Sequence, residues 1–134
     1  MKKDITFHQV QEVALAVTRQ LNELQQPEWH VRIINNNPFP IENVLITSKG
    51  YGQKEGVEQK TSTLRHLIEV VEAHSGAIVE PIDPSVFHLT NEYWVSYYID
   101  KQIYDKKFLF VPDSIREDNL SLIETLDMEG VLHP

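Results

Sequence analysis

One short segment of the chain gathers side chains that hydrolytic enzymes use. Thr61-Ser62-Thr63-Leu64-Arg65-His66 combines hydroxyl groups, a cation and an imidazole. Nucleophilic catalysis needs a hydroxyl beside a general base, a third group that orients the base, and donors for the developing oxyanion. Ser62 and His66 would share a face of a helix or of a strand, but no orienting acid or oxyanion hole is identifiable. We therefore assign no catalytic residue, and we keep Arg65 and His66 as candidate binding residues.

The histidines are the only candidate transition-metal ligands besides carboxylates, because the chain contains no cysteine. That absence also excludes disulfides, thiolate zinc sites and cysteine nucleophiles. Zinc sites often reveal themselves as histidine pairs at short spacing, such as His-x-x-x-His. No such pair occurs among His8, His30, His66, His74, His88 and His133. We predict no metal and no cofactor, and a site built in three dimensions from His66, His88 and a carboxylate stays as an alternative.

A glycine-rich stretch, Ser48-Lys49-Gly50-Tyr51-Gly52, invites comparison with phosphate-binding loops. Such loops place glycines at a strand-to-helix turn, followed by a lysine or a helix N-terminus. Here two glycines flank a tyrosine and more polar residues follow, so neither requirement is met. We predict that residues 49–56 form a polar loop at the end of a strand. The glycines would permit positive φ or a bulge there. An exposed loop would present Lys49 and Tyr51 to a partner, so Tyr51 is a candidate binding residue.

Aromatic side chains are concentrated in residues 92–112. Two aromatic and β-branched runs flank a short polar connection, which predicts an antiparallel β-hairpin ending at Pro112. Alternation places Trp94 and Tyr98 on the face opposite Tyr93, Val95, Tyr97 and Ile99. One face must be core. The other is either buried as well, under a helix and the opposite sheet, or it is an interaction surface, since Trp and Tyr often anchor interfaces. Trp94 and Tyr98 therefore complete the candidate binding residues.

The elements that would position these side chains are mostly strands. Residues 29–34 alternate with Trp29, Val31 and Ile33 on one face. A cluster of Asn and Pro in residues 35–40 breaks the chain, and residues 41–48 and 77–82 give two further strands. A lone hairpin cannot hide its apolar face, so these strands must form a second layer.

Two segments, residues 8–25 and 62–75, fit a helix and a strand equally well. The first has apolar residues at helical spacing (Val10, Val13, Ala14, Val17, Leu21, Leu24), yet Val13, Leu15 and Val17 also alternate. The second has Leu64, Leu67, Ile68 and Val71 at helical spacing, or a strand over residues 61–68. Consistency with the rest of the chain favours strands in both, because a sandwich needs about seven.

The C-terminal segment, residues 113–134, predicts an acidic helix. Ser114 and Glu117 have capping-box spacing, and Gly130 offers a stop. Between them, Ile115, Leu122, Ile123 and Leu126 form a one-sided stripe. This segment also carries six acidic residues and one arginine, a net charge of −5 out of −8 for the whole chain. We expect the helix to pack on the sandwich or on a neighbouring subunit.

The order of elements resembles the immunoglobulin or fibronectin-III-like β-sandwich class. Residues 29–35, the Pro-Phe-Pro-Ile break and residues 42–46 look like the B and C strands of such a module, and residues 92–99 and 106–112 look like its last two strands. The resemblance implies an antiparallel immunoglobulin-like sandwich over residues 10–112, followed by the helical segment 113–134, within a single domain of residues 1–134. No catalytic motif accompanies this class.

Composition limits the partners. The chain has 134 residues and no dense Lys/Arg block, so we expect no nucleic-acid binding. The sequence has no long apolar run, so we expect no membrane insertion and a cytoplasmic location. We predict a non-enzymatic module that acts through protein contacts, including self-association. The alternative is a small-ligand or metal-binding protein, or an enzyme, that uses Arg65, His66 and nearby carboxylates.

Overall fold

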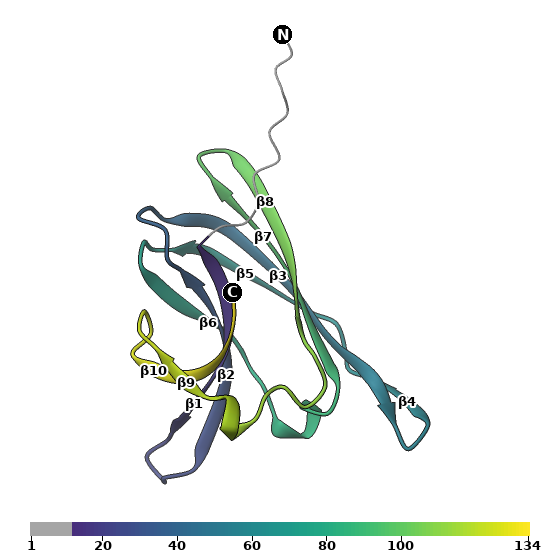
Figure 1. The fold of residues 1–134 in the computed structure, drawn as a ribbon. Coiled ribbons are helices and arrows are strands. Elements are labelled where there is room, and N and C mark those ends of the chain that lie inside the picture. Colours follow the sequence, from purple (N-terminus) through teal and green to yellow (C-terminus); the bar gives the residue numbers. More distant parts are fainter. Residues whose placement is uncertain (1–11) are drawn as a thin grey trace.

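A computed structural model describes residues 12–134, which form two antiparallel β-sheets (Figure 1). The first sheet has the order β6-β2-β1-β10-β9, and the second has the order β4-β3-β7-β8, with β5 also paired to β3. The first sheet contains β1 (Val13–Leu21), β2 (Pro27–Asn35), β6 (Ser75–Pro81), β9 (Ser121–Ile123) and β10 (Met128–His133). The second contains β3 (Ile41–Lys54), β4 (Val57–Lys60), β5 (Leu64–Val71), β7 (Thr90–Ile99) and β8 (Gln102–Phe110).

Helical structure within residues 12–134 is limited to two 3₁₀ turns, η1 (Pro84–Val86) and η2 (Glu117–Asn119). No helix in this part of the chain has the length and hydropathy to cross a membrane. The mostly β, antiparallel architecture predicted from the sequence is confirmed.

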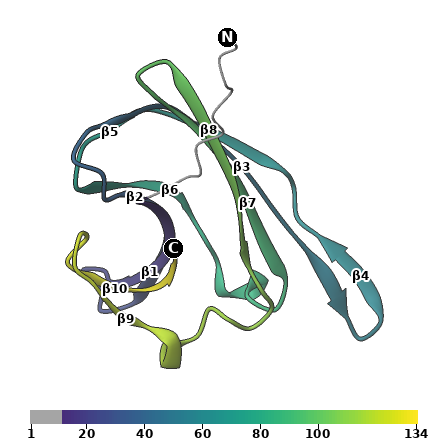
Figure 2. The ribbon, with the colours of Figure 1, turned by 45° about the horizontal axis from the view of Figure 1, so that its top comes forward.

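The two sheets curve around one apolar interior, from which the β3–β4 hairpin projects (Figure 2). Alternate side chains of β2, β7 and β8 enter this core, as the period of two predicts. Trp29, Val31 and Ile33 of β2 are all buried on one face, in agreement with the sequence. The second sheet supplies Ile41, Val44, Ile46, Val71, Tyr93, Val95, Tyr97, Phe108 and Phe110.

Both ambiguous segments are strands within the described residues; residues 8–11 of the first segment lie outside them. β1 pairs with β2 from Val13 to Leu21, and β5 pairs with β3 along its whole length. The helix-like stripe of β1 has a tertiary cause. Leu15 and Val17 enter the main core, while Ala14 and Ala16 on the opposite face are buried in a second cluster with Ile123 and Leu126. A strand covered on both faces loses the clean alternation that identifies it.

The expected loop over residues 49–56 is wrong. β3 continues to Lys54, because its backbone is paired on both sides: Gly50 lies opposite Asn91 of β7, and Tyr51 lies opposite Lys60 of β4. The turn is confined to Glu55 and Gly56, which have φ of 53° and 78°. Positive φ at both central residues matches the twist of a two-residue hairpin turn. Asp100 and Lys101, with φ of 48° and 72°, connect β7 to β8 in the same way.

The predicted C-terminal helix is also wrong. Residues 113–134 form the short turn η2 and the β9–β10 hairpin, which lies at the edge of the first sheet beside β1 (Figure 1). The Ser114 hydroxyl, expected to cap a helix, donates to the carbonyl of Val111 instead. Gly130 lies inside β10 rather than at a helix end, because β10 approaches β1 too closely there for a side chain. Pairing with β1 therefore overrides the local helical spacing.

Candidate functional site

The side of the second sheet that faces away from the core exposes large apolar side chains to solvent. We call it the outer face. Large side chains with 36–66% of their surface exposed lie there on four adjacent strands: Leu45, Leu67, Val70, Trp94, Tyr98, Ile103 and Leu109. Trp94 is 45% exposed and Tyr98 is 38% exposed. The alternative in which both faces of the 92–112 hairpin are buried is therefore wrong, since no helix within residues 12–134 covers the outer one. An apolar patch of this kind on a folded chain usually marks an interaction surface.

Strand pairing arranges the outer face in regular rows across the sheet. Thr47 of β3 lies opposite both Arg65 of β5 and Trp94 of β7, and Trp94 lies opposite Lys107 of β8. The Lys107 ammonium lies 5.9 Å from the centre of the Trp94 ring, where the ring face attracts a cation. The next row contains Leu67, Leu45, Ser96 and Asp105.

The structure places Arg65, Trp94 and Tyr98 together on this outer face. Tyr51 lies at its edge, where its hydroxyl donates to Glu92 Oε1 at 3.1 Å. Lys49 Nζ lies 3.6 Å from Glu92 Oε2. The fifth candidate, His66, points the other way, because neighbouring residues of a strand face opposite sides. Arg65 and His66 therefore do not belong to one site.

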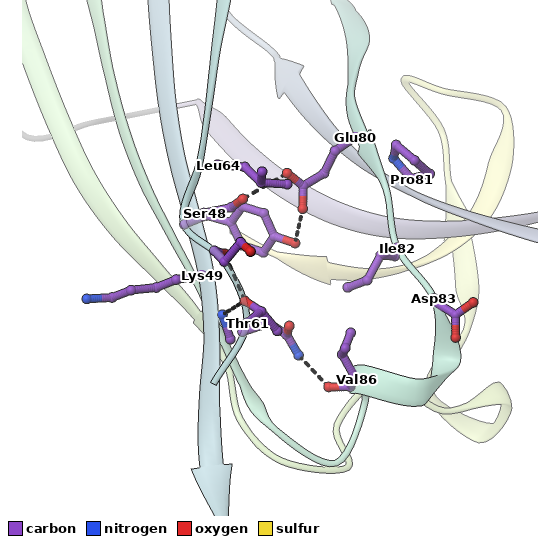
Figure 3. Close-up of a pocket in the computed structure, with 13 residues that line it drawn as sticks. Ser48, Lys49, Thr61, Leu64, Glu80, Pro81, Ile82, Asp83 and Val86 are labelled. Atoms are coloured by element: carbon purple, nitrogen blue, oxygen red, sulfur yellow. Dashed lines mark hydrogen bonds between the residues drawn. The ribbon is translucent and has the colours of Figure 1, made fainter. Parts of the chain in front are cut away.

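His66 instead contacts Glu80, which lines a pocket of about 380 Å³ between the second sheet and the segment that follows β6 (Figure 3). Ser48, Thr61, Asn91 and Glu80 line it with polar atoms. Leu64, Pro81, Ile82 and Val86 give it apolar walls. Lys49 also borders the pocket, but its side chain points away from it in Figure 3.

Glu80 is the polar centre of this pocket, with a side chain only 11% exposed. The Ser48 hydroxyl donates to Oε1 at 2.8 Å, and His66 Nε2 lies 2.7 Å from the same oxygen. The Tyr93 hydroxyl donates to Oε2 at 3.2 Å. Burial first, and then the adjacent Glu80 carboxylate, raise the pKa of Tyr93 well above its usual range, so Tyr93 remains a donor at neutral pH.

The geometry around Glu80 lacks the Ser-His pair of a catalytic triad. Ser48 donates to the Glu80 carboxylate and not to the imidazole, so Ser48 and His66 do not form the hydroxyl–imidazole pair of a Ser-His-Asp arrangement. His88 is the other histidine of the alternative metal site. Its Nε2 atom lies 2.6 Å from Oε1 of Gln59, within hydrogen-bond distance. Residues 12–134 contain no group of three or more His, Asp or Glu side chains that could hold a metal ion. His66, His88 and a carboxylate therefore do not form the site that the sequence left open.

Sequence reasoning missed Glu80 for a physical reason. β2 and β6 change register between Val31 and Arg32, so that Val31 pairs with Glu80 while Arg32 pairs with Ile78. The extra residue, Val79, forms a bulge, and both Val79 and Glu80 then turn toward the interior. Strict alternation would point one of them to solvent.

Comparisons with family models, with curated proteins and with solved structures found no match for this chain.

Proposed function

We propose that this protein is a non-enzymatic, cytoplasmic β-sandwich module that works by binding another protein through the outer face. One observation carries the proposal: seven large apolar side chains stay exposed on four adjacent strands of one sheet. Burying them removes apolar surface from water, which is the main favourable term in association. Trp94 and Tyr98 are the residue types that most often supply binding energy at interfaces.

The strand order supports an immunoglobulin-like type for this module. Such a sandwich places strands A, B and E in one sheet and C, F and G in the other. Here β1-β2-β6 and β3-β7-β8 are adjacent in that order, and β5 lies beside β3 as an added C′ strand does. The β9–β10 hairpin is an addition at the edge of the first sheet. Modules of this class serve many functions, so the proposed binding rests on the exposed face and not on the fold.

Trp94→Ala tests the proposal. Truncation of an interface anchor typically weakens binding by at least tenfold, whereas the stability of the free chain should change little, since Trp94 is half exposed. The measurement is quantitative mass spectrometry of proteins captured from an extract of the source cells, with wild type and variant immobilised at equal density.

Leu132→Ala is the matched control, because Leu132 is 47% exposed but lies on the first sheet. We expect a partner that is retained by wild type and by Leu132→Ala, and lost from Trp94→Ala. Identical capture by all three proteins, at equal free energy of unfolding, would overturn the proposal.

A second candidate function, small-ligand binding, is favoured by Glu80. A carboxylate held by Ser48, His66 and Tyr93 at the side of a pocket is a preorganised acceptor for a hydrogen-bonding ligand. Arg65 takes no part in this version. Because a ligand that binds the native state raises the melting temperature, a thermal-shift screen of small polar compounds tests it. Ser62→Trp fills the pocket from an exposed position and should abolish any shift; a shift that survives Ser62→Trp would place the ligand elsewhere.

A further inference from the structure

The polar residues on the outer face follow a pattern that favours one kind of partner. Four consecutive rows cross the sheet. Two have already been described: Arg65-Thr47-Trp94-Lys107 and Leu67-Leu45-Ser96-Asp105. They are flanked on one side by Lys49-Glu92-Leu109 and on the other by Val70-Glu42-Tyr98-Ile103. Lys107 and Lys49 in one half of this face occupy positions equivalent to those of Asp105 and Glu42 in the other half.

We propose that the occupant of the outer face is a second copy of this chain, related by a two-fold axis that lies in the plane of the interface and runs across the strands. This inference rests on the proposed function, protein binding through the outer face, and identifies the partner. A two-fold interface uses the same patch on both copies, so that every contact occurs twice. An axis in this direction reverses the strand direction of the second copy. The row that contains Trp94 in each copy then lies on the row that contains Ser96 in the other copy, and the row that contains Lys49 lies on the row that contains Val70.

Charge is complementary in this arrangement. Lys107 of one copy faces Asp105 of the second copy, and Lys49 faces Glu42 of the second copy. All four side chains are exposed in the single chain. By symmetry the interface would contain four pairs of opposite charge. Opposite charges across an interface fix its register and suppress other arrangements.

Side-chain size is complementary as well. Trp94, the largest residue on the face, lies over Ser96 of the second copy, one of the smallest. Leu109 lies over Ile103 of the second copy. A tryptophan that enters the space above a small residue excludes water from the centre of an interface, where binding energy concentrates. Two β-sheets that pack face to face keep their strands within about 30° of each other, which this axis allows.

The other in-plane axis, parallel to the strands, is disfavoured by the same residues. It would place Arg65 over Lys107 of the second copy, so that like charges meet, and Leu67 over Asp105 of the second copy. The opposite pair that it forms, Lys49 over Glu92 of the second copy, only offsets the like pair, whereas the axis across the strands forms opposite pairs alone. Juxtaposed like charges at an interface are unfavourable. The distribution of charge therefore selects one axis direction as well as the partner.

Charge reversal tests the axis. Asp105→Lys would place a lysine against Lys107 of the second copy, and Lys107→Asp would place two aspartates together. Each change occurs twice in the dimer, so we expect each variant to raise the dimer dissociation constant at least tenfold. The double variant Asp105→Lys/Lys107→Asp restores opposite charges and should return the constant to within about threefold of wild type. Sedimentation equilibrium over 1–200 µM protein measures all four.

Glu129→Lys is the matched control for Asp105→Lys, since it makes the same change in net charge at an exposed position on the first sheet and should leave dimerisation unchanged. A wild-type chain that is monomeric over the whole concentration range would overturn the inference. So would a dimer that either single reversal leaves intact, or one that the double variant does not restore.

The two proposals fail in different ways. If the wild-type chain is monomeric but Trp94→Ala still loses a captured protein, the outer face binds a different partner: the proposed function stands and the second copy is wrong. If a dimer forms that Trp94→Ala does not weaken, self-association uses another surface. If neither dimerisation nor capture responds to Trp94→Ala, both proposals are wrong.

Discussion

At the scale of single residues, Asn35 shows how much one buried amide can organise. Its side chain is fully buried. The amide nitrogen donates to the carbonyls of Phe39, Val71 and Glu72, and the amide oxygen accepts from the backbone and side chain of Asn37. These contacts join the end of β2 in the first sheet to the end of β5 in the second. From sequence, Asn35 was only one of several turn-forming residues.

We predict that Asn35→Ala lowers the free energy of unfolding by about 2–3 kcal/mol, because it leaves several buried backbone groups without partners. Urea denaturation followed by tryptophan fluorescence measures the change. Asn119→Ala is the control: Asn119 is exposed and donates one bond, to the Ser114 carbonyl, so it should cost less than about 1 kcal/mol. Equal losses for the two variants would argue against a special role for Asn35.

At the scale of elements, β10 shows how tertiary pairing overrides a local pattern. A Cβ atom built on Gly130 would lie 2.9 Å from the Val17 carbonyl oxygen and 2.8 Å from Ile123 Cδ1. The carbonyl belongs to the backbone of β1 and cannot rotate away. Glycine is therefore needed for β10 to lie against β1, although the same glycine suggests a helix stop when only neighbouring residues are considered.

We accordingly expect Gly130→Ala to destabilise the protein by about 1–3 kcal/mol, despite the higher intrinsic strand cost of glycine. The measurements are the urea midpoint and hydrogen exchange. In the variant, the amides of β9 and β10 should lose their protection against exchange before those of other strands. Ser121→Ala, at an exposed position on the neighbouring strand β9, should change neither quantity. An unchanged midpoint for Gly130→Ala would contradict this prediction, because it would mean that β10 and β1 can move apart to accommodate a methyl group with no loss of folding free energy.

At the scale of the whole molecule, tyrosines at the sheet interface make the fold sensitive to alkali. Tyr93 and Tyr97 are almost completely buried in the core between the two sheets. Burial, reinforced by Glu80 in one case and by Tyr104 in the other, raises the pKa of both phenols well above the ordinary value. The Tyr97 hydroxyl, moreover, has no hydrogen-bond partner within residues 12–134.

Stability should therefore fall as the pH rises above about 10, the ordinary tyrosine pKa. Below that pH both states keep the phenols neutral; above it the unfolded chain loses protons that the folded chain retains, which favours unfolding. Absorbance at alkaline pH should show tyrosines that ionise only as the protein unfolds. Tyr97→Phe should leave stability at pH 7 unchanged or higher and should reduce the alkaline loss. Ionisation of all five tyrosines together near pH 10, with the fold intact, would contradict this prediction.

Strand positions were largely predictable because alternation is a local property. It located β2 and the β7–β8 hairpin, and it correctly assigned Tyr93, Val95 and Tyr97 to the buried face of that hairpin. It gave no direct sign of the Glu80 pocket, which depends on a bulge in β6 and on contacts from three different strands. Adjacency in the sequence also did not predict membership of one site, since Arg65 and His66 face opposite sides of one sheet.

By itself, the sequence determined that the described chain is built of antiparallel strands and which side of most strands is apolar, because each residue's preference and the period of two act over a few neighbours. Only the tertiary structure decided that residues 121–133 pair as strands, that Glu80 turns inward, and that Trp94 remains uncovered. Each of these depends on which distant segment lies alongside, and the free energy of such pairing exceeds the weak local preferences that the sequence displays.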